Sequence, residues 1–439
     1  MVNSTVVEKY LRVHAELDAT NLSLPARKGN PISGQNSLQS PTYQNGLVIP
    51  AHRESADSLL AVCQHIHDKT SLLVVIVINS SEAESEAEAK LFRNLIALGS
   101  SRSINLGITL VEKKTGPDLL LIDRFSRGRT IDHHQGVGLA RKIGADIMLK
   151  LWHTGHIASP WLHNTDADAV LPSNYFDIML RHDGKTLLRT FYHSTENLNH
   201  AALPDEQTRD QIAAALYDLS LLYYPAGLRK AGSPYGFPTI GSTLSCKFEA
   251  YAHVRGFPKR NAAEDFYMLN KLRKLGPVLT PNGPPIILSS RRSARVPIGT
   301  GRAIERIATL NQPITNFRFE HPDCFKKLKE FLEQLHDCVM TNSQTEIKRN
   351  STARLYLEKS GLNVHLEKLS KRTSRKDVRA KSISDWFDAL RTRQFIHQVR
   401  DTELGTLSLI DLANYFGVNE SAEQSLVSLR QKFADQIYQ

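Results

Sequence analysis

Apolar residues in the first third of the chain follow two spacings, one typical of strands and one typical of helices. Runs of strand length cover residues 46–52, 71–81 and 118–124. Segments with apolar residues at helical spacing cover 55–67, 81–99 and 136–152. The run SLLVVIVINSS is apolar almost throughout, as in a parallel strand that helices cover on both faces. The alternation predicts βαβ units, and therefore an α/β sheet with helices on both faces and ligands at the carboxyl ends of the strands.

Two regions flank this pattern. Residues 26–45 are rich in Gly, Pro, Ser, Asn and Gln, which is typical of a linker after a short helical segment. From about residue 305 the pattern changes to helices with polar spacers, and 14 Lys and Arg stand against 6 Asp and Glu between 341 and 400. We therefore expect an N-terminal segment and linker at 1–45, an α/β domain at 46–304 and a mostly helical region at 305–439.

Composition and charge narrow the class of protein. The 439 residues are 41% apolar and 23% charged, which is ordinary for a soluble globular protein. A formal net charge of +10 favours anionic partners such as phosphates, nucleotides, nucleic acid or an acidic membrane surface. The four cysteines form no CxxC pair, which indicates a reducing compartment and neither a disulfide framework nor a zinc site. The N-terminus lacks the pattern of a signal peptide, and the longest apolar run, 72–78, is too short to cross a bilayer. We expect a cytoplasmic protein.

Two aspartates separated by one residue, Asp166 and Asp168, follow the short apolar stretch PWLHNT. Side chains at i and i+2 of an extended backbone point to the same side. Both carboxylates can therefore face one Mg²⁺ or Mn²⁺ ion while a substrate diphosphate fills other positions. An acidic turn or helix start before Pro172 explains the same motif. The motif alone is weak support for a metal site, so its surroundings have to decide.

Further polar segments follow the other strands in a fixed order. They are VIPAHRE, VINSS, GLARKIGAD, TDADA, VRGFP and AEDFYMLNKLRKLG. Over roughly residues 46–300, this ordered set resembles the family 2 type of nucleotide-sugar glycosyltransferases, which have the GT-A fold. The resemblance implies transfer of a hexose from a nucleotide diphosphate sugar to an acceptor hydroxyl, helped by Mg²⁺ or Mn²⁺.

The resemblance implies roles for four residues at the nucleotide. Pro50, Ala51 and Glu54 match the turn that holds the base and ribose. Asn79 stands where the family usually has an aspartate that contacts the nucleobase. Because an amide can both donate and accept hydrogen bonds, this departure leaves the choice of base open.

The resemblance also implies roles at the reacting groups. Asp166 and Asp168 match the motif that holds metal and diphosphate, and Glu264 and Asp265 match the acidic pair from which inverting members take the catalytic base. A carboxylate near the acceptor hydroxyl can take its proton, so we expect Asp265, or else Glu264, to be the base if the enzyme inverts. A retaining enzyme needs another geometry. Without the upstream segments, favourable charge at a helix N-terminus explains the acidic pair better.

Two basic segments are candidates for phosphate binding. GVGLAR departs from G-x-G-x-x-G at Arg141, which argues against a dinucleotide fold. Arg141 and Lys142 either face phosphate or are solvated helix charges. The segment 289–303 resembles an Arg- and Gly-containing segment of glycosyltransferases that act on small acids, and it predicts a clamp for diphosphate or for a small anionic acceptor. A surface loop is the alternative. Its arginines are Arg291, Arg292, Arg295 and Arg302.

The histidines add no assigned ligand. No histidine lies between His253 and His321, where a third metal ligand was sought, so that ligand is unassigned. We take His193, His200 and the His133–His134 pair as ordinary polar or core residues.

The basic C-terminal region, including 368–381, has few interleaved aromatics and no recognisable nucleic-acid module. It predicts a solvated helical face, and a lipid-linked acceptor remains open. Two other functions also remain open. A sugar-phosphate nucleotidyltransferase would carry a glycine-rich loop in the first βα unit, which VIPAHRE lacks. A non-enzymatic basic protein that binds anions or nucleic acid would tolerate loss of Asp168.

Overall fold

The chain folds into two compact units. In the computed structural model, the described residues are 4–22, 24, 42–67, 69, 71–177, 184–188, 191–193, 206–290, 299–341, 356 and 359–438. The first unit combines 1–194 with 239–302, and the second combines 195–238 with 303–439.

A nine-stranded sheet in the order β10-β7-β9-β6-β1-β2-β5-β4-β3 forms the centre of the first unit. Its parallel middle consists of β6 (Trp161–Asn164), β1 (Asn45–Ala51), β2 (Leu72–Asn79) and β5 (Asp118–Arg124). Every residue of β2 is buried, as its apolar sequence predicts. Antiparallel pairing attaches β4 (Ile108–Glu112) and β3 (Ser100–Asn105) on one side, and β9 (Leu244–Lys247) with β7 (Thr186–Leu188) on the other. The edge strand β10 (Val278–Leu279) is parallel to β7, and β8 (Phe191–His193) pairs with β11 (Ile286–Leu288) in a separate sheet.

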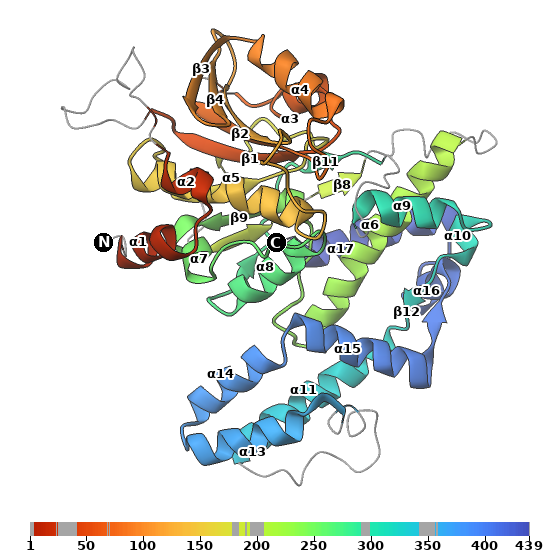
Figure 1. Cartoon of the computed structure of the whole chain (residues 1–439). Coiled ribbons are helices and arrows are strands. Elements are labelled where there is room, and N and C mark those ends of the chain that lie inside the picture. The colour runs from red at the N-terminus through yellow and green to blue at the C-terminus, as the bar shows by residue number, and fades with distance from the viewer. Residues whose placement is uncertain are drawn as a thin grey trace. The chain divides into compact units, whose positions relative to one another are not determined.

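Helices cover both faces of this sheet. Figure 1 shows α3 (Ala56–Val62) and α4 (Glu86–Ile96) on one face of the parallel strands, and α5 (Gly136–His153) on the other. The helices α7 (Phe248–His253) and α8 (Glu264–Arg273) follow β9. The predicted α/β sheet with helices on both faces is therefore confirmed. The β3–β4 hairpin at its edge was not predicted.

The N-terminal segment packs on the first unit. Its helices α1 (Ser4–Val13) and α2 (Leu17–Thr20) lie against α7 and α5. The hydroxyl of Tyr10 donates to Asp146 Oδ1 at 2.6 Å, and Lys142 Nζ donates to Tyr10 Oη at 2.8 Å and to Asp146 Oδ2 at 2.7 Å. These side chains are buried. Lys142 is therefore neither a solvated charge nor directed at phosphate.

The second unit is mostly helical, as predicted for the C-terminal region. Its helices are α6 (Glu206–Lys230), most of α9 (Thr300–Ala308), α10 (Pro313–Asn316), α11 (Asp323–Thr341), α13 (Leu362–Arg372), α14 (Lys376–Trp386), α15 (Ala389–Val399), α16 (Leu409–Tyr415) and α17 (Ala422–Ile437), with a small sheet of β12 (Phe319–Glu320) and β13 (Thr406–Leu407). Tyr223 of α6 packs against Phe325 and Phe433, with ring centroids 5.5 and 5.2 Å apart. Residues 195–238 thus belong to this unit, whereas the sequence placed them in the α/β domain.

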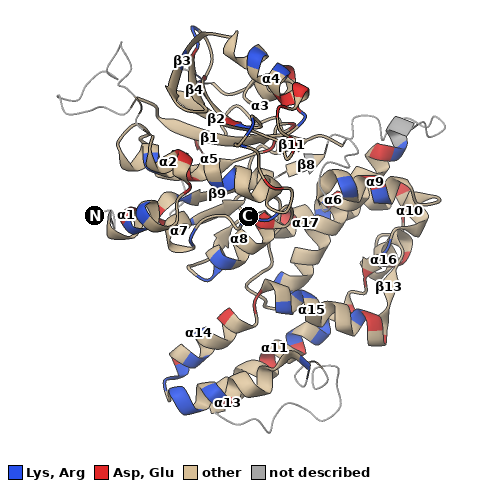
Figure 2. Ribbon diagram, in the orientation of Figure 1, with Lys and Arg blue, Asp and Glu red and all other residues tan. Residues whose placement is uncertain are grey.

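The second unit carries the basic stretch of the sequence. Lys and Arg cluster on α13 and α14 in Figure 2, and Lys368, Lys371, Arg372 and Lys376 are exposed. Within the described residues, no helix is both long and apolar enough to cross a membrane.

Candidate active site

Three neighbouring strands bring the predicted nucleotide and metal residues to one edge of the sheet. Ala51 at the end of β1 pairs with Ile78, so Asn79 at the end of β2 lies at the same edge. On the other side of β1, Val48 pairs with Asn164, the last residue of β6, and Asp166 follows two residues later. The carboxyl ends of parallel strands are where α/β sheets bind ligands.

Arg141 of α5 joins the two acidic motifs. Its side chain is buried; Nη2 donates to Asp166 Oδ1, and Nε donates to Glu264 Oε1 at 2.9 Å. Arg141 Nη1 also reaches the carbonyl oxygen of Thr165 at 3.5 Å. A guanidinium that bridges two carboxylates fixes their separation, because its donors lie in one rigid plane. The alternative of a solvated helix charge is therefore wrong for Arg141.

Two glycines allow α5 to lie close enough for this contact. A Cβ on Gly144 would lie 2.4 Å from a methyl carbon of Val48 in β1. A Cβ on Gly138 would lie 2.4 Å from the carbonyl oxygen of Arg260, in the loop before α8. Larger residues would push α5 away from β1 and from the loop that leads to Glu264. The glycines of GVGLARKIG thus serve helix packing.

Asp265 lies beside Glu264 in the first turn of α8 and is partly buried. Burial raises its pKa, and the charges of Glu264 and Asp166 add to that effect. The Phe266 N–H donates to Asp265 Oδ1 at 2.7 Å and, with Arg141, favours the charged form. Burial and the neighbouring negative charges outweigh these two contacts, and they raise the pKa of Asp265 to about 7. Such a carboxyl can release and accept a proton near neutral pH, as a general base must.

Several buried polar groups around this cluster have no hydrogen-bond partner among the described residues. They are the side-chain oxygen of Asn79, both polar side-chain atoms of Asn164, the hydroxyl of Thr165 and the hydroxyl of Ser242. Ser242 lies in a short turn, Gly241–Thr243, that contacts both β6 and α8. Buried polar groups are normally satisfied, so unpaired groups beside Asp166 and Glu264 are consistent with a polar ligand that completes them.

The turn after β1 is held by a buried glutamate, Glu88, that the sequence analysis did not single out. Glu88 of α4 is fully buried; it accepts the Arg53 N–H at 2.8 Å, lies 3.1 Å from His52 Nδ1 and accepts the Ser85 hydroxyl. Burial by itself raises the pKa of Glu88, but these hydrogen bonds outweigh it and lower that pKa to about 2. The turn needs such support because Arg53 has φ of 53°, in the left-handed region.

Asp166 and Asp168, the predicted metal ligands, carry the kind of donor atoms that a divalent cation prefers. Asp166 and Asp168 are carboxylates at a strand end, and both are partly exposed. Asp166 Oδ1 accepts a hydrogen bond from Arg141, and 40% of the Asp166 side chain is accessible to solvent. Oxygen donors of this kind suit Mg²⁺ or Mn²⁺. The third ligand is not assigned.

The remaining predicted residues come from several other elements. Pro50 is the residue before the last of β1, and Glu54 is partly exposed in the turn that follows. Arg302 is exposed at the start of α9. His193 is buried in β8, as expected for a core residue. Arg291, Arg292, Arg295 and His200 lie outside the described residues.

Comparisons with known proteins add two structural likenesses. No protein-family model and no curated protein matches the chain. It is similar to S. aureus TarS 1-349 in complex with UDP-GlcNAc, with 13% identity over 85% of this chain and 92% of that chain and a TM-score of 0.35. It is also similar to the mannosyltransferase PcManGT from Pyrobaculum calidifontis in complex with GDP-Man and Mn²⁺, with 14% identity over 92% and 90% and a TM-score of 0.35. At these scores, the function has to be argued from the residues of this chain.

Proposed function

We propose that this protein is a glycosyltransferase that moves a hexose from a nucleotide diphosphate sugar to an acceptor hydroxyl. The observation that carries the proposal is the buried Arg141, which joins Asp166 after β6 to Glu264 and thereby to Asp265. Asp166, the proposed diphosphate ligand, and Asp265, the proposed base with a pKa of about 7, thus belong to one cluster at the edge where α/β sheets bind ligands.

If the enzyme inverts, Asp265 is the proposed base. Its carboxylate takes the proton of the acceptor hydroxyl while the acceptor oxygen forms a bond to the sugar carbon. The bond from that carbon to the diphosphate breaks, and the diphosphate leaves with the electron pair. Glu264 keeps Arg141 in place, and Arg141 holds Asp166. Asp166 and Asp168 would hold Mg²⁺ or Mn²⁺, which neutralises charge on the leaving diphosphate.

The donor's nucleotide would lie at the ends of β1 and β2. Asn79 is only 8% exposed, and its side-chain oxygen has no hydrogen-bond partner in the described part of the chain. It is therefore suited to accept a hydrogen bond from a base. Pro50, Ala51 and Glu54 would form the rest of this contact. Because the segment 289–303 is rich in arginine, we prefer a small anionic acceptor. We also propose that the protein is cytoplasmic.

Thermal unfolding with a panel of nucleoside diphosphates and their sugars tests the proposal, each with Mn²⁺ and with chelator. A ligand at a hundred times its dissociation constant stabilises the folded state by about 2.7 kcal/mol, which is a shift of several degrees at roughly 2–4 °C per kcal/mol. We expect nucleotides of one base to give this shift, and chelator or Asp168→Asn to remove it.

A matched control is Asp57→Asn, which changes an exposed aspartate at the start of α3 and should leave the shift intact. A panel that leaves the midpoint unmoved, or a shift that survives both chelator and Asp168→Asn, contradicts the proposal. A nucleotidyltransferase is recognised separately, because it would form the nucleotide sugar from a sugar phosphate and a nucleoside triphosphate.

A further inference from the structure

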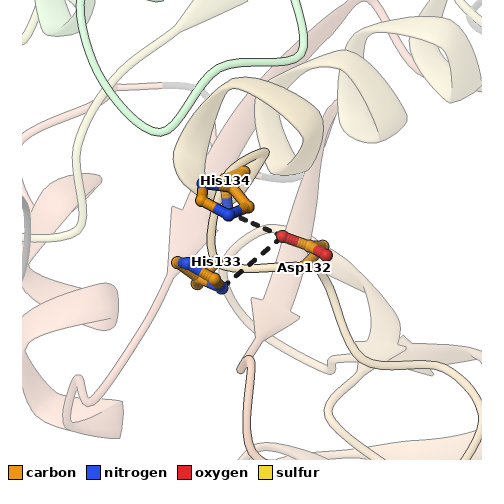
Figure 3. A group of neighbouring side chains, drawn as sticks. All are labelled: Asp132, His133 and His134. Atoms are coloured by element: carbon orange, nitrogen blue, oxygen red, sulfur yellow. Dashed lines mark hydrogen bonds and ion pairs between the residues drawn. The ribbon is translucent and has the colours of Figure 1, made fainter.

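The turn between β5 and α5 gathers three potential metal ligands outside the site described above. Asp132, His133 and His134 each offer one ligand atom, and these atoms all lie within 4.8 Å of one another (Figure 3). All three residues are exposed, so an ion can reach them from solvent. The two imidazole rings lie side by side, with centroids 3.8 Å apart.

Backbone hydrogen bonds hold this turn in one conformation. The His134 N–H donates to Asp132 Oδ1 at 2.8 Å, and the Gln135 and Gly136 N–H groups donate to the Asp132 carbonyl at 2.9 and 3.0 Å. Just before the turn, the buried Ile131 donates its N–H to the carbonyl of Ser80 at 2.9 Å. The backbone that carries the three ligands is therefore held in place before any ion binds, which reduces the entropy lost on binding.

The packing of Gly136 anchors the other end of the turn. Gly136 has φ of 35°, and a Cβ there would lie 2.2 Å from Asn261 Oδ1. The turn thus rests on the loop before α8, and the ligand set is tied to the folded body of the first unit.

The donor set selects a class of ion. Two imidazole nitrogens and one carboxylate oxygen suit Zn²⁺, Ni²⁺ or Cu²⁺, whereas Mg²⁺ prefers oxygen alone. We propose that Asp132, His133 and His134 bind one divalent transition-metal ion of this class, with water in the remaining positions. These ligands are other residues than Asp166 and Asp168, and the proposal does not depend on the proposed transferase activity.

The helix that follows opposes the ion only weakly. The positive end of a helix dipole disfavours a nearby cation by about 0.3–1 kcal/mol. A site of micromolar affinity has a binding free energy of about −8 kcal/mol. The dipole of α5 therefore weakens the site without removing it.

Isothermal titration of the full chain, without a polyhistidine tag, with Zn²⁺ in excess Mg²⁺ tests this site. Mg²⁺ is present to occupy oxygen-only sites. We expect one Zn²⁺ per chain. Binding should weaken by at least about 100-fold in the double variant His133→Ala, His134→Ala, because loss of a mere outer-shell partner already costs about 10–100-fold. His153→Ala, which removes an exposed histidine at the other end of α5, should bind as the wild type does.

Electron paramagnetic resonance of the Cu²⁺-loaded protein checks the ligands independently and should show nitrogen coupling that the double variant lacks. Circular dichroism of the metal-free variants verifies that they fold. The proposal is overturned if the wild type binds no Zn²⁺, or if the double variant binds it equally well. It is also overturned if Asp168→Asn, and not the histidine variant, removes binding, because the ion is then held by Asp166 and Asp168.

Discussion

The carboxyl group of Asp265 lies where its charge is costly. Burial and the like charges of Glu264 and Asp166 raise its pKa from 3.8 to about 7. Between these two values, folded Asp265 still binds a proton that the unfolded chain has released. The folded state is therefore favoured at low pH, and this contribution is lost as the pH rises through about 7.

This shift predicts opposite effects of Asp265→Asn on activity and on stability. If Asp265 is the base, as proposed, the rate of transfer by the wild type should rise with pH through about 7, because only an ionised carboxyl can accept the acceptor's proton. The variant should bind nucleotide but lose about 10²–10⁴-fold in kcat. It should unfold at a higher temperature than the wild type at about pH 8, because the neutral amide avoids the cost of a charge.

Rate profiles against pH, and unfolding midpoints at about pH 5 and about pH 8, measure both effects. Asp57→Asn serves again as the exposed control and should change neither. An unchanged rate profile in Asp265→Asn would show that another group is the base, with Glu264 the next to test.

The sequence predicted the acidic residues of this site better than the residues that hold them. Asp166, Asp168, Glu264 and Asp265 follow recognisable segments, but which groups contact one another depends on tertiary packing. Glu88 is one of several acidic residues at 81–99, so its residue type does not distinguish it from its neighbours. Its spacing to Leu91 and Leu95 places it on the buried face of α4, and that periodicity was the available signal.

At the scale of elements, α1 is part of the support of α5. Tyr10 lies between Lys142 and Asp146 in a network that is almost fully buried. The sequence predicted a short helical segment before a linker, without a contact to the α/β domain. The i, i+4 pair of Lys142 and Asp146 within an otherwise apolar stretch was a signal for a buried partner, but a sequence does not say which segment supplies it.

Tyr10→Phe tests this support. The substitution removes one hydroxyl and leaves Lys142 and Asp146 short of a hydrogen bond in a buried place, so we expect a loss of about 1–3 kcal/mol of stability in the first unit. Tyr415→Phe is the matched control, because its hydroxyl donates to Asp323 at 2.8 Å in an exposed place. Denaturant unfolding should show a change within about 0.5 kcal/mol for the control. Equal effects of the two substitutions would argue that the buried network adds no stability.

At the scale of the whole molecule, the chain leaves the first unit at about residue 194 and returns to it at about 239. The intervening α6 is packed into the second unit. Its Asp218, whose side chain is 1% exposed, pairs with Arg430 of α17 at 2.9 Å. Amphipathic spacing shows that a helix has an apolar face, but not which distant helices cover it. The predicted boundary at 304 therefore separated α6 from the helices that bury it.

This arrangement predicts that a fragment of residues 1–304 does not form a stable, monomeric fold. It would expose the apolar face of α6, including Tyr223, and leave Asp218 without Arg430, because α11 and α17 are missing. We expect it to self-associate and to be cut by proteases within α6.

The control is a fragment of 1–302 in which a flexible Gly-Ser linker replaces 195–238. It should be monomeric and should keep the shift in unfolding midpoint that nucleotides cause. Size-exclusion chromatography with light scattering, and limited proteolysis, distinguish the two. A monomeric 1–304 fragment with a protease-resistant α6 would mean that the first unit can cover this helix by itself.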